Sequence, residues 1–385
     1  MKIRISTAAI AALALVAAAG AAAPKWTFVP AVPLPAGVAN SQLRAVTAVS
    51  ARDLWVGGAW WDKTQVHPLL AHWDGTAWTV PALPALPQDA YLTGVDAVGA
   101  GDVWAVGSTA PGLAPNSPST PSVLHYDGLT WRPVPTPALP AGSANDLDAI
   151  DMRTAGDGWA VGETSTGSLA QPLILRWRAG EWIGSPVPKS AGASGGLVAV
   201  AAAAADDVWA VGTEVDTATG AGHGLVLHFD GATWSRAELS TPAGTTLDAV
   251  AVAGPGDVWA AGRTCGLACA AAVWHLTAAG WQPVPPIGGT EVAALVAFGP
   301  DDVWTLGYQL LPNNRKADHV EHWDGKRFTA EDTGLPTLPP PGGNQGELGS
   351  ATPIFAAAGV PETGELWAVG WSDPPAVAPR MIHRG

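Results

Sequence analysis

Short apolar segments bounded by small and polar residues recur along the whole chain. A segment resembling Asp-Val-Trp-Ala-Val-Gly occurs seven times, with its tryptophan at Trp55, Trp104, Trp159, Trp209, Trp259, Trp304 and Trp367. Successive tryptophans are 49, 55, 50, 50, 45 and 63 residues apart. Short apolar runs between Gly, Pro and Asp indicate β-strands, and a period of about 50 residues is the size of one propeller blade.

Each repeat predicts four antiparallel strands, called a, b, c and d in chain order. Strand b carries the tryptophan, and strand a carries a small residue followed by an aliphatic one, which suits the crowded axis of a ring. These pairs are Ala45-Val46, Gly94-Val95, Ala149-Ile150, Ala199-Val200, Ala249-Val250 and Ala294-Leu295. Strand c is an apolar run that in several repeats ends at an Asp-Gly turn, a strong hairpin signal. Strand d begins near a second aromatic, namely Trp78, Trp131, Trp182, Trp234, Trp281 or Phe328.

The seventh repeat stops at Gly385, where its strand d should begin. A matching strand is present at the other end of the chain, in residues 25–30. We therefore predict an all-β fold, a seven-bladed β-propeller with four antiparallel strands per blade. The N-terminal strand completes the last blade, so that no edge strand is left unpaired.

The first 23 residues have the pattern of a signal peptide. Lys2 and Arg4 precede a short apolar run at residues 5–16, and small residues follow at 17–23. The interpretation is a signal peptide at 1–23 and one propeller at 24–385, in a secreted, extracellular protein. The apolar run is too short and too alanine-rich to favour a membrane span, and no later run is long enough.

The formal net charge is −14, and the sequence contains no cluster of Lys and Arg that would form a basic patch. Such a chain repels phosphate, which argues against nucleic-acid partners and against docking on anionic membranes. Cys265 and Cys269 are the only cysteines. In an exported protein they predict a small-loop disulfide, with two free thiols as the alternative, and two cysteines alone do not make a metal site.

The order of an inner strand, a Trp-Ala-Val-Gly strand and then His-x-Asp-Gly-x-x-Trp resembles kelch repeats. It is also similar to sialidase-type Asp-box propellers and to the propellers of photosystem II assembly factors. The resemblance covers nearly the whole chain after the signal segment and implies the propeller fold. It leaves function open, because these families include enzymes, lectins and scaffolds. Only the first repeat has the kelch double glycine, Gly57-Gly58, and the Asp-Gly turn is tighter than a full Asp box.

Acidic and basic residues repeat with the blades. An acid lies two residues before each strand-b tryptophan, at Asp53, Asp102, Asp157, Asp207, Asp257, Asp302 and Glu365. A base lies near the end of each strand c, at His72, His125, Arg176, His228, His275, His322 and His383. One pair per blade cannot converge on one ion, so we predict a hydrogen bond within each blade, no metal site and no cofactor.

Residues that vary between blades are free to contact a ligand. The position after the glycine of strand b is assigned to Gly58, Ser108, Glu163, Thr213, Arg263, Tyr308 and Trp371. Strand a adds Arg44, Asp148 and Asp248 at one equivalent position. We predict that Glu163, Arg263, Tyr308 and Trp371 join these three at the face formed by the b–c and d–a connections. The alternative is that these residues are solvent-exposed rim residues that contact no ligand. Trp60 and Trp61 either stack on a ligand or cover the core.

The longest connection runs from about residue 330 to 352. It contains the run Pro339-Pro340-Pro341-Gly342-Gly343, followed by Asn344, Gln345 and Glu347. Connections of this length are functional or disordered more often than not. The connection is interpreted as a flap whose three polar residues contact a ligand, or else as a solvated insertion.

The predicted function is a non-catalytic binding or scaffold propeller, a monomer that recognises an extracellular glycan, peptide or protein at the channel face. The alternative is a secreted carbohydrate-active enzyme: a glycosidase, lyase or oxidase. For this alternative, Asp148 and Asp248 are candidate paired acids, and Arg44, Arg263 and Arg380 a candidate arginine triad. An enzyme requires ionisable groups with shifted pKa values gathered in a cleft at the channel mouth.

Overall fold

The computed structural model describes residues 25–36, 38, 40–86, 89–111, 118–140, 142–167, 169–188, 192–312, 316–335, 354–372 and 378–385. The predicted signal peptide and the predicted flap residues Asn344, Gln345 and Glu347 lie outside the described residues. Within the described ranges, no helix is long and apolar enough to cross a bilayer.

The described residues form seven sheets of four strands each. Blade 1 consists of β2 (Asn40–Ser50), β3 (Asp53–Trp61), β4 (Val66–Trp73) and β5 (Trp78–Thr79), and blade 2 of β6 (Asp89–Gly99), β7 (Asp102–Ala110), β8 (Thr120–Tyr126) and β9 (Trp131–Pro133). Blade 3 consists of β10 (Ala144–Thr154), β11 (Asp157–Thr166), β12 (Leu169–Arg178) and β13 (Glu181–Gly184), and blade 4 of β14 (Ala193–Ala204), β15 (Asp207–Asp216), β16 (Gly222–Phe229) and β17 (Trp234–Arg236). Blade 5 consists of β18 (Thr245–Gly254), β19 (Asp257–Cys265), β20 (Cys269–Thr277) and β21 (Gly280–Pro283), and blade 6 of β22 (Glu291–Gly299), β23 (Asp302–Leu310), β24 (Lys316–Trp323) and β25 (Phe328–Glu331). Blade 7 consists of β26 (Ile354–Val360), β27 (Glu365–Ser372), β28 (Ala378–Arg384) and β1 (Trp26–Phe28).

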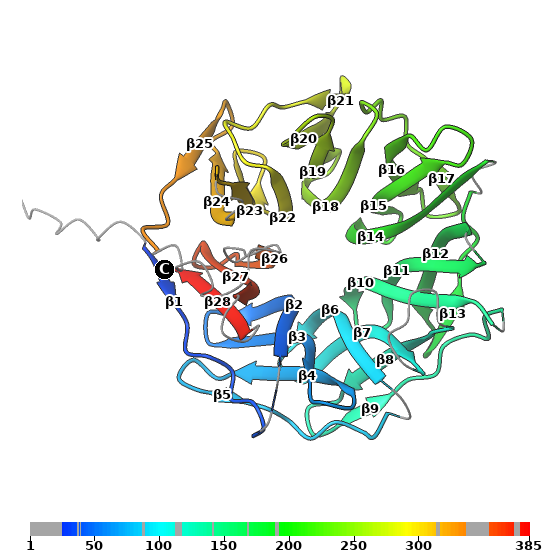
Figure 1. Ribbon diagram of the computed structural model, residues 1–385, viewed down its shortest axis with the longest axis vertical. Helices are drawn as coiled ribbons and strands as arrows, with labels where there is room; N and C mark the ends of the chain where they lie inside the picture. The colour runs from blue at the N-terminus through cyan, green and yellow to red at the C-terminus, as the bar shows by residue number, and fades with distance from the viewer. Residues whose placement is uncertain are drawn as a thin grey trace, which may run out of the picture.

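The blades are arranged in a ring, and the first strand of each sheet faces the centre (Figure 1). Strands a, b, c and d therefore follow one another from the axis to the rim, as the repeat predicts. The seven-bladed propeller predicted from the sequence is confirmed.

Ring closure by the N-terminal strand is also confirmed. Strand β1 pairs antiparallel with β28, Thr27 opposite His383, so the first and last strands of the described chain share one sheet (Figure 1). Trp26 is only 6% exposed, and its Nε1 donates a hydrogen bond to Glu331 Oε1 of blade 6 at 2.9 Å. Arg384 Nε donates to the same oxygen, so the closing blade is also tied to its neighbour.

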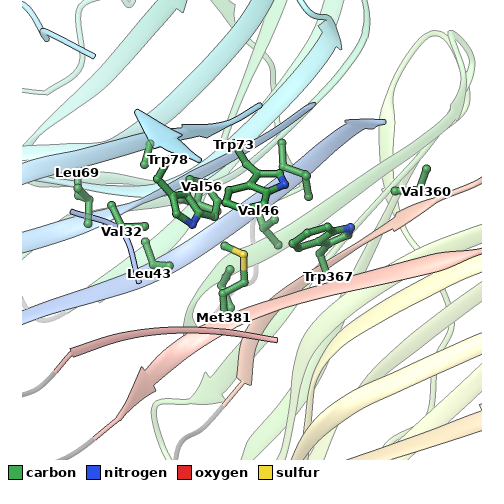
Figure 2. Packing of buried hydrophobic residues seen from close by; sticks show 13 residues of the cluster. Val32, Leu43, Val46, Val56, Leu69, Trp73, Trp78, Val360, Trp367 and Met381 are labelled. Atoms are coloured by element: carbon green, nitrogen blue, oxygen red, sulfur yellow. The ribbon is translucent and has the colours of Figure 1, made fainter. Parts of the chain in front are cut away.

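Aromatic side chains join neighbouring blades. The strand-b tryptophan of one blade contacts the strand-d aromatic of the next, as in the ring pair Trp159 and Trp234, whose centroids lie 5.2 Å apart. Figure 2 shows the junction between blades 7 and 1, where Trp367 and Met381 pack beside Trp73. The strand-c tryptophan Trp73 thus packs between the two blades, with 6.4 Å between the ring centroids of Trp73 and Trp367.

The predicted acid–base pair forms in all seven blades. In blade 5, His275 Nε2 and Asp257 Oδ1 are 2.8 Å apart, and the same oxygen accepts the indole N–H of Trp259 at 3.0 Å. The imidazole also stacks on that indole, with 3.9 Å between centroids. The other pairs are Asp53–His72, Asp102–His125, Asp157–Arg176, Asp207–His228, Asp302–His322 and Glu365–His383, at 2.8 to 3.1 Å. These repeated ionisable groups are therefore structural.

The glycine that ends the strand-b motif is required by close backbone contact. In blade 3, a Cβ added to Gly162 would lie 2.0 Å from the carbonyl oxygen of Asp146 on strand a. Gly58 of blade 1 has the same contact, with Gln42. This corrects the sequence alignment in blade 1: Gly58 is the motif glycine itself, and Ala59 is the residue that follows it, opposite Gln42.

The predicted disulfide between Cys265 and Cys269 is confirmed. The two cysteines pair where β19 turns into β20, and Leu267 at the tip of this turn is fully exposed.

Candidate functional site at the channel mouth

Each inner strand contains a β-bulge next to its small residue. In blade 3, pairing with β11 is interrupted between Leu147 and Ala149, so Asp148 has no partner in the ladder. The bulged residues of the seven blades are Arg44, Thr93, Asp148, Val198, Asp248, Ala293 and Phe355. All seven line one central cavity of about 220 Å³. The predicted equivalence of Arg44, Asp148 and Asp248 is therefore confirmed.

A second layer of polar residues surrounds this ring on the side of the b–c turns. Here the residue after the motif glycine faces a strand-a residue, as in Asp146 opposite Glu163 and Glu291 opposite Tyr308. Tyr91, Asp146 and Glu291 belong to this layer and were not predicted from the sequence. Each stands three residues before the small residue of its strand, so comparison of that position across repeats would have found them.

Blade 3 gathers three carboxyl groups, on Asp146, Asp148 and Glu163. Tyr91 of blade 2 donates its hydroxyl hydrogen to Asp146 Oδ1 at 2.9 Å. The carboxyl groups of Asp148 and Glu163 accept no hydrogen bond within the part of the chain that the structure describes. Burial, reinforced by Glu163 and Asp146, raises the pKa of Asp148 to about 7, although the positive charge of Arg44 acts in the opposite direction. Burial and then Asp146 raise the pKa of Glu163.

Arg44 lies beside this cluster. Its guanidinium carbon is 4.7 Å from the ring centroid of Phe355, and it makes no hydrogen bond to any described residue. Burial lowers the pKa of Arg44, and the charge of Asp148 opposes that effect. The first three blades and the seventh thus present one guanidinium and three carboxyl groups at one side of the mouth.

The opposite side of the mouth is more fully paired. Arg263 of blade 5 forms an ion pair with Glu291 of blade 6, whose Oε2 also accepts the hydroxyl of Tyr308 at 3.2 Å. Asp248 accepts a hydrogen bond from Thr246 at 3.2 Å. Burial, followed by Glu291, raises the pKa of Asp248 to about 6, and Arg263 opposes the shift.

The remaining predicted residues lie elsewhere. Trp60 stacks on His67 at 3.9 Å between centroids, while the backbone of Trp61 pairs with Val66; neither tryptophan lines the cavity. The backbone of Trp371 lies in β27, and its side chain is outside the described part. The arginine triad is contradicted: Arg380 is buried, and its guanidinium bonds Asp318 instead of facing the channel. Among the described residues, no group of three or more His, Cys, Asp or Glu side chains is arranged to hold a metal.

A second pair of carboxyl groups lies deeper along the inner strands. Asp96 of blade 2 accepts the backbone N–H of Met152 of blade 3 at 2.6 Å. Asp151 of blade 3 accepts the backbone N–H of Ala202 of blade 4 at 3.0 Å. Burial, followed by the charge of Asp96, raises the pKa of Asp151 to about 7, and burial also raises that of Asp96. These groups tie three consecutive blades together.

Asp151 gives a pH-dependent stability prediction. Its raised pKa means that the folded state binds this proton more tightly than the unfolded state, so its contribution to stability is lost as the pH rises from about 4 through about 7. Asp151→Asn keeps the acceptor for Ala202 without the charge. We expect it to raise the free energy of unfolding by about 1–3 kcal/mol at pH 8 and to change it little at pH 4.5. Urea unfolding at both pH values measures this, with exposed Asp206→Asn as the control. An equal effect at both pH values would contradict the prediction.

Comparisons with known proteins give the fold class. No protein-family model matches the chain, and no curated protein matches it. The structure is similar to one described as YCF48 bound to D1 peptide, with a TM-score of 0.55, 14% identity, and coverage of 93% of this chain and 94% of that one. A GH74 xyloglucanase from Xanthomonas campestris gives a TM-score of 0.54 at 15% identity, covering 90% of this chain and 53% of the enzyme. Trypanosoma rangeli sialidase, as its difluorosialic acid covalent intermediate, gives 0.52 at 9%, covering 93% and 59%. The chain is thus a seven-bladed β-propeller.

Proposed function

We propose that the protein is a non-catalytic binding propeller that takes an extracellular peptide, protein or glycan at the channel mouth. The proposal is based on a difference in hydrogen bonding between the ionisable residues that repeat in every blade and those that do not. Every ionisable residue that repeats with the blades has a hydrogen-bonded partner in its own blade, as Asp257 has in His275. The side chains of Arg44, Asp148 and Glu163, which do not form such a repeated pair, make no hydrogen bond to any described residue. Partial burial disfavours the charged forms of these side chains, and a ligand that supplies hydrogen-bond partners or opposite charge offsets that cost.

The fold-level similarity to a propeller described as bound to a peptide agrees with a peptide or protein ligand. The strand-b glycine and the strand-d aromatic support a place among kelch-like or Asp-box-like propellers. We also propose that the protein acts outside the cell as a monomer, after removal of residues 1–23. The pattern of Lys2, Arg4 and the apolar run supports export. N-terminal sequencing of the protein from culture medium tests it, and retention of Met1 would overturn it.

Array screening tests the binding function. Purified protein is applied to peptide and glycan arrays beside an Arg44→Gln/Asp148→Asn variant. Arg52→Gln/Asp301→Asn is the matched control, because it removes the same two charges from the a–b turns. Arg52 lies between β2 and β3, and Asp301 lies between β22 and β23. We expect a ligand whose affinity falls at least tenfold in the mouth variant and stays within twofold in the control. Ligands that bind both variants equally would contradict a site at the mouth.

A carbohydrate-active enzyme is the second candidate. Its supporting observation is that Asp148 and Asp248 line one cavity and have pKa values raised to about 7 and about 6. Carboxyl groups held near neutral pKa can serve as acid and base catalysts. Hydrolysis of a panel of aryl glycosides, lost in both Asp148→Asn and Asp248→Asn, would establish this function in place of binding alone.

A further inference from the structure

The channel mouth has more negative than positive groups. Five carboxyl groups belong to its two layers, on Asp146, Asp148, Glu163, Asp248 and Glu291. The cations are Arg44, Arg263 and Lys316, whose Nζ lies 4.3 Å from the ring centroid of Tyr308. Arg263 is already paired with Glu291, so the excess of negative charge is concentrated at blade 3.

The three carboxyl groups of blade 3 have few donors between them. The hydroxyl of Tyr91 serves Asp146, while Asp148 and Glu163 have no hydrogen-bond donor among the described residues. Glu163 lies over Gly196 of blade 4, where an added Cβ would be 2.7 Å from its Oε2. Its carboxyl group is therefore held at the junction of blades 3 and 4 and does not extend freely into solvent.

The neighbouring ring position is apolar. Val198 of blade 4 stands between Asp148 and Asp248 in the ring and is 41% exposed inside the same cavity. A carboxylate beside an exposed valine suits a cation carried on an alkyl stem, because the stem packs on the valine while its charged end reaches the acid. Lysine and arginine side chains have this form.

We propose that Asp148 and Glu163, supported by Asp146, bind the guanidinium or ammonium group of a lysine or arginine side chain presented by the ligand. This inference rests on the proposed binding function and specifies its ligand as a basic peptide segment. The carboxylates accept the N–H donors of the cation. Arg44, which has no protein acceptor among the described residues, donates to a backbone carbonyl of the same ligand.

The affinity then depends on pH. The groups that interact electrostatically with Asp148 are Arg44 on β2, Tyr91 on β6, Asp146 on β10 and Glu163 on β11. The pKa of Asp148 is raised to about 7, so the carboxylate is mostly protonated at pH 6 and mostly ionised at pH 8. Because only the ionised form attracts a cation, we expect affinity to rise up to about tenfold between these pH values.

The probe is N-butylguanidinium, and N-butylurea is its neutral isostere. Calorimetric titration of the purified protein at pH 8 should show binding of the cation and at least tenfold weaker binding of the urea. Asp148→Asn/Glu163→Gln should weaken cation binding at least tenfold. Asp206→Asn/Asp301→Asn removes the same charge at the a–b turns and should leave binding within twofold. Melting curves of all variants report folding.

Absence of N-butylguanidinium binding, or equal binding by the mouth and control variants, would overturn the cation site. The cation site would also be overturned if a ligand found on the arrays kept its affinity for the mouth after its arginine was replaced by citrulline, or its lysine by norleucine. That result would not contradict the proposed binding function. Conversely, cation binding with the expected variant pattern, but no array ligand at the mouth, would leave the cation site standing and remove the proposed function.

Discussion

Removal of residues 25–30 should lower the Tm of the protein by about 10 °C or more. The deletion takes away the strand that pairs with β28, together with the buried indole of Trp26 and its hydrogen bond to Glu331. Truncation of one buried tryptophan alone costs about 3–5 kcal/mol, and the lost strand pairing adds to it. Blade 7 would also be left with an unpaired outer edge at β28.

Differential scanning calorimetry of the deletion variant and of two single substitutions tests the closure. Trp26→Ala should account for roughly half of the loss. Thr27→Ala, at an exposed position of the same strand, should change the Tm by less than about 1 °C. A deletion variant that melts like the wild type would show that β1 does not hold the ring together.

Removal of either partner of the Asp318–Arg380 ion pair should cost about 3–5 kcal/mol of unfolding free energy. Arg380 on β28 donates to both carboxylate oxygens of Asp318 on β24, at 2.8 and 2.5 Å, and both side chains are almost fully buried. Either single substitution leaves one charge buried between blades 6 and 7 without its counterion. Chemical denaturation of Asp318→Leu and of Arg380→Met measures the cost.

The double variant Asp318→Leu/Arg380→Met should recover most of the stability lost by each single variant. Burial raises the pKa of Asp318 even though Arg380 lowers it, so removal from water outweighs the attraction within the pair. Replacement of the whole pair by apolar side chains therefore removes the desolvation cost of two charges. Additive losses in the double variant would show that the pair is strongly stabilising instead.

The repeating part of the structure was predictable because the same residue pattern makes the same contacts in each blade. The acid two residues before Trp259 lies on the same face of its strand as that tryptophan, and His275 lies opposite Trp259 in the ladder. These contacts follow from strand periodicity and hairpin order, which can be read from the sequence. Closure by residues 25–30 followed from counting strands.

The candidate site was predicted only in part. Arg44, Asp148 and Asp248 were placed together because they share a repeat position, and the cavity confirms this. The hydrogen bond between Tyr91 and Asp146 and the ion pair of Arg263 with Glu291 join different blades. Side-chain direction across a blade boundary depends on the tilt of the sheets and on the bulge, and neither is encoded in one repeat. For the same reason Arg380, predicted as part of a triad, points into the junction with Asp318.

The number of blades, the order of their strands and the pairing of the repeated ionisable residues can be derived from the sequence, because those features arise from interactions within one repeat or between similar neighbouring repeats. Which of the non-repeating ionisable residues have hydrogen-bond partners depends instead on how the blades pack around the ring. Asp318 and Arg380 are 62 positions apart in sequence and meet, whereas Asp148 and Glu163 come from adjacent strands of one blade and have no hydrogen-bond donor in the described chain. Ring curvature brings strands from seven blades to one axis, and that convergence sets the burial and the charge of the channel mouth.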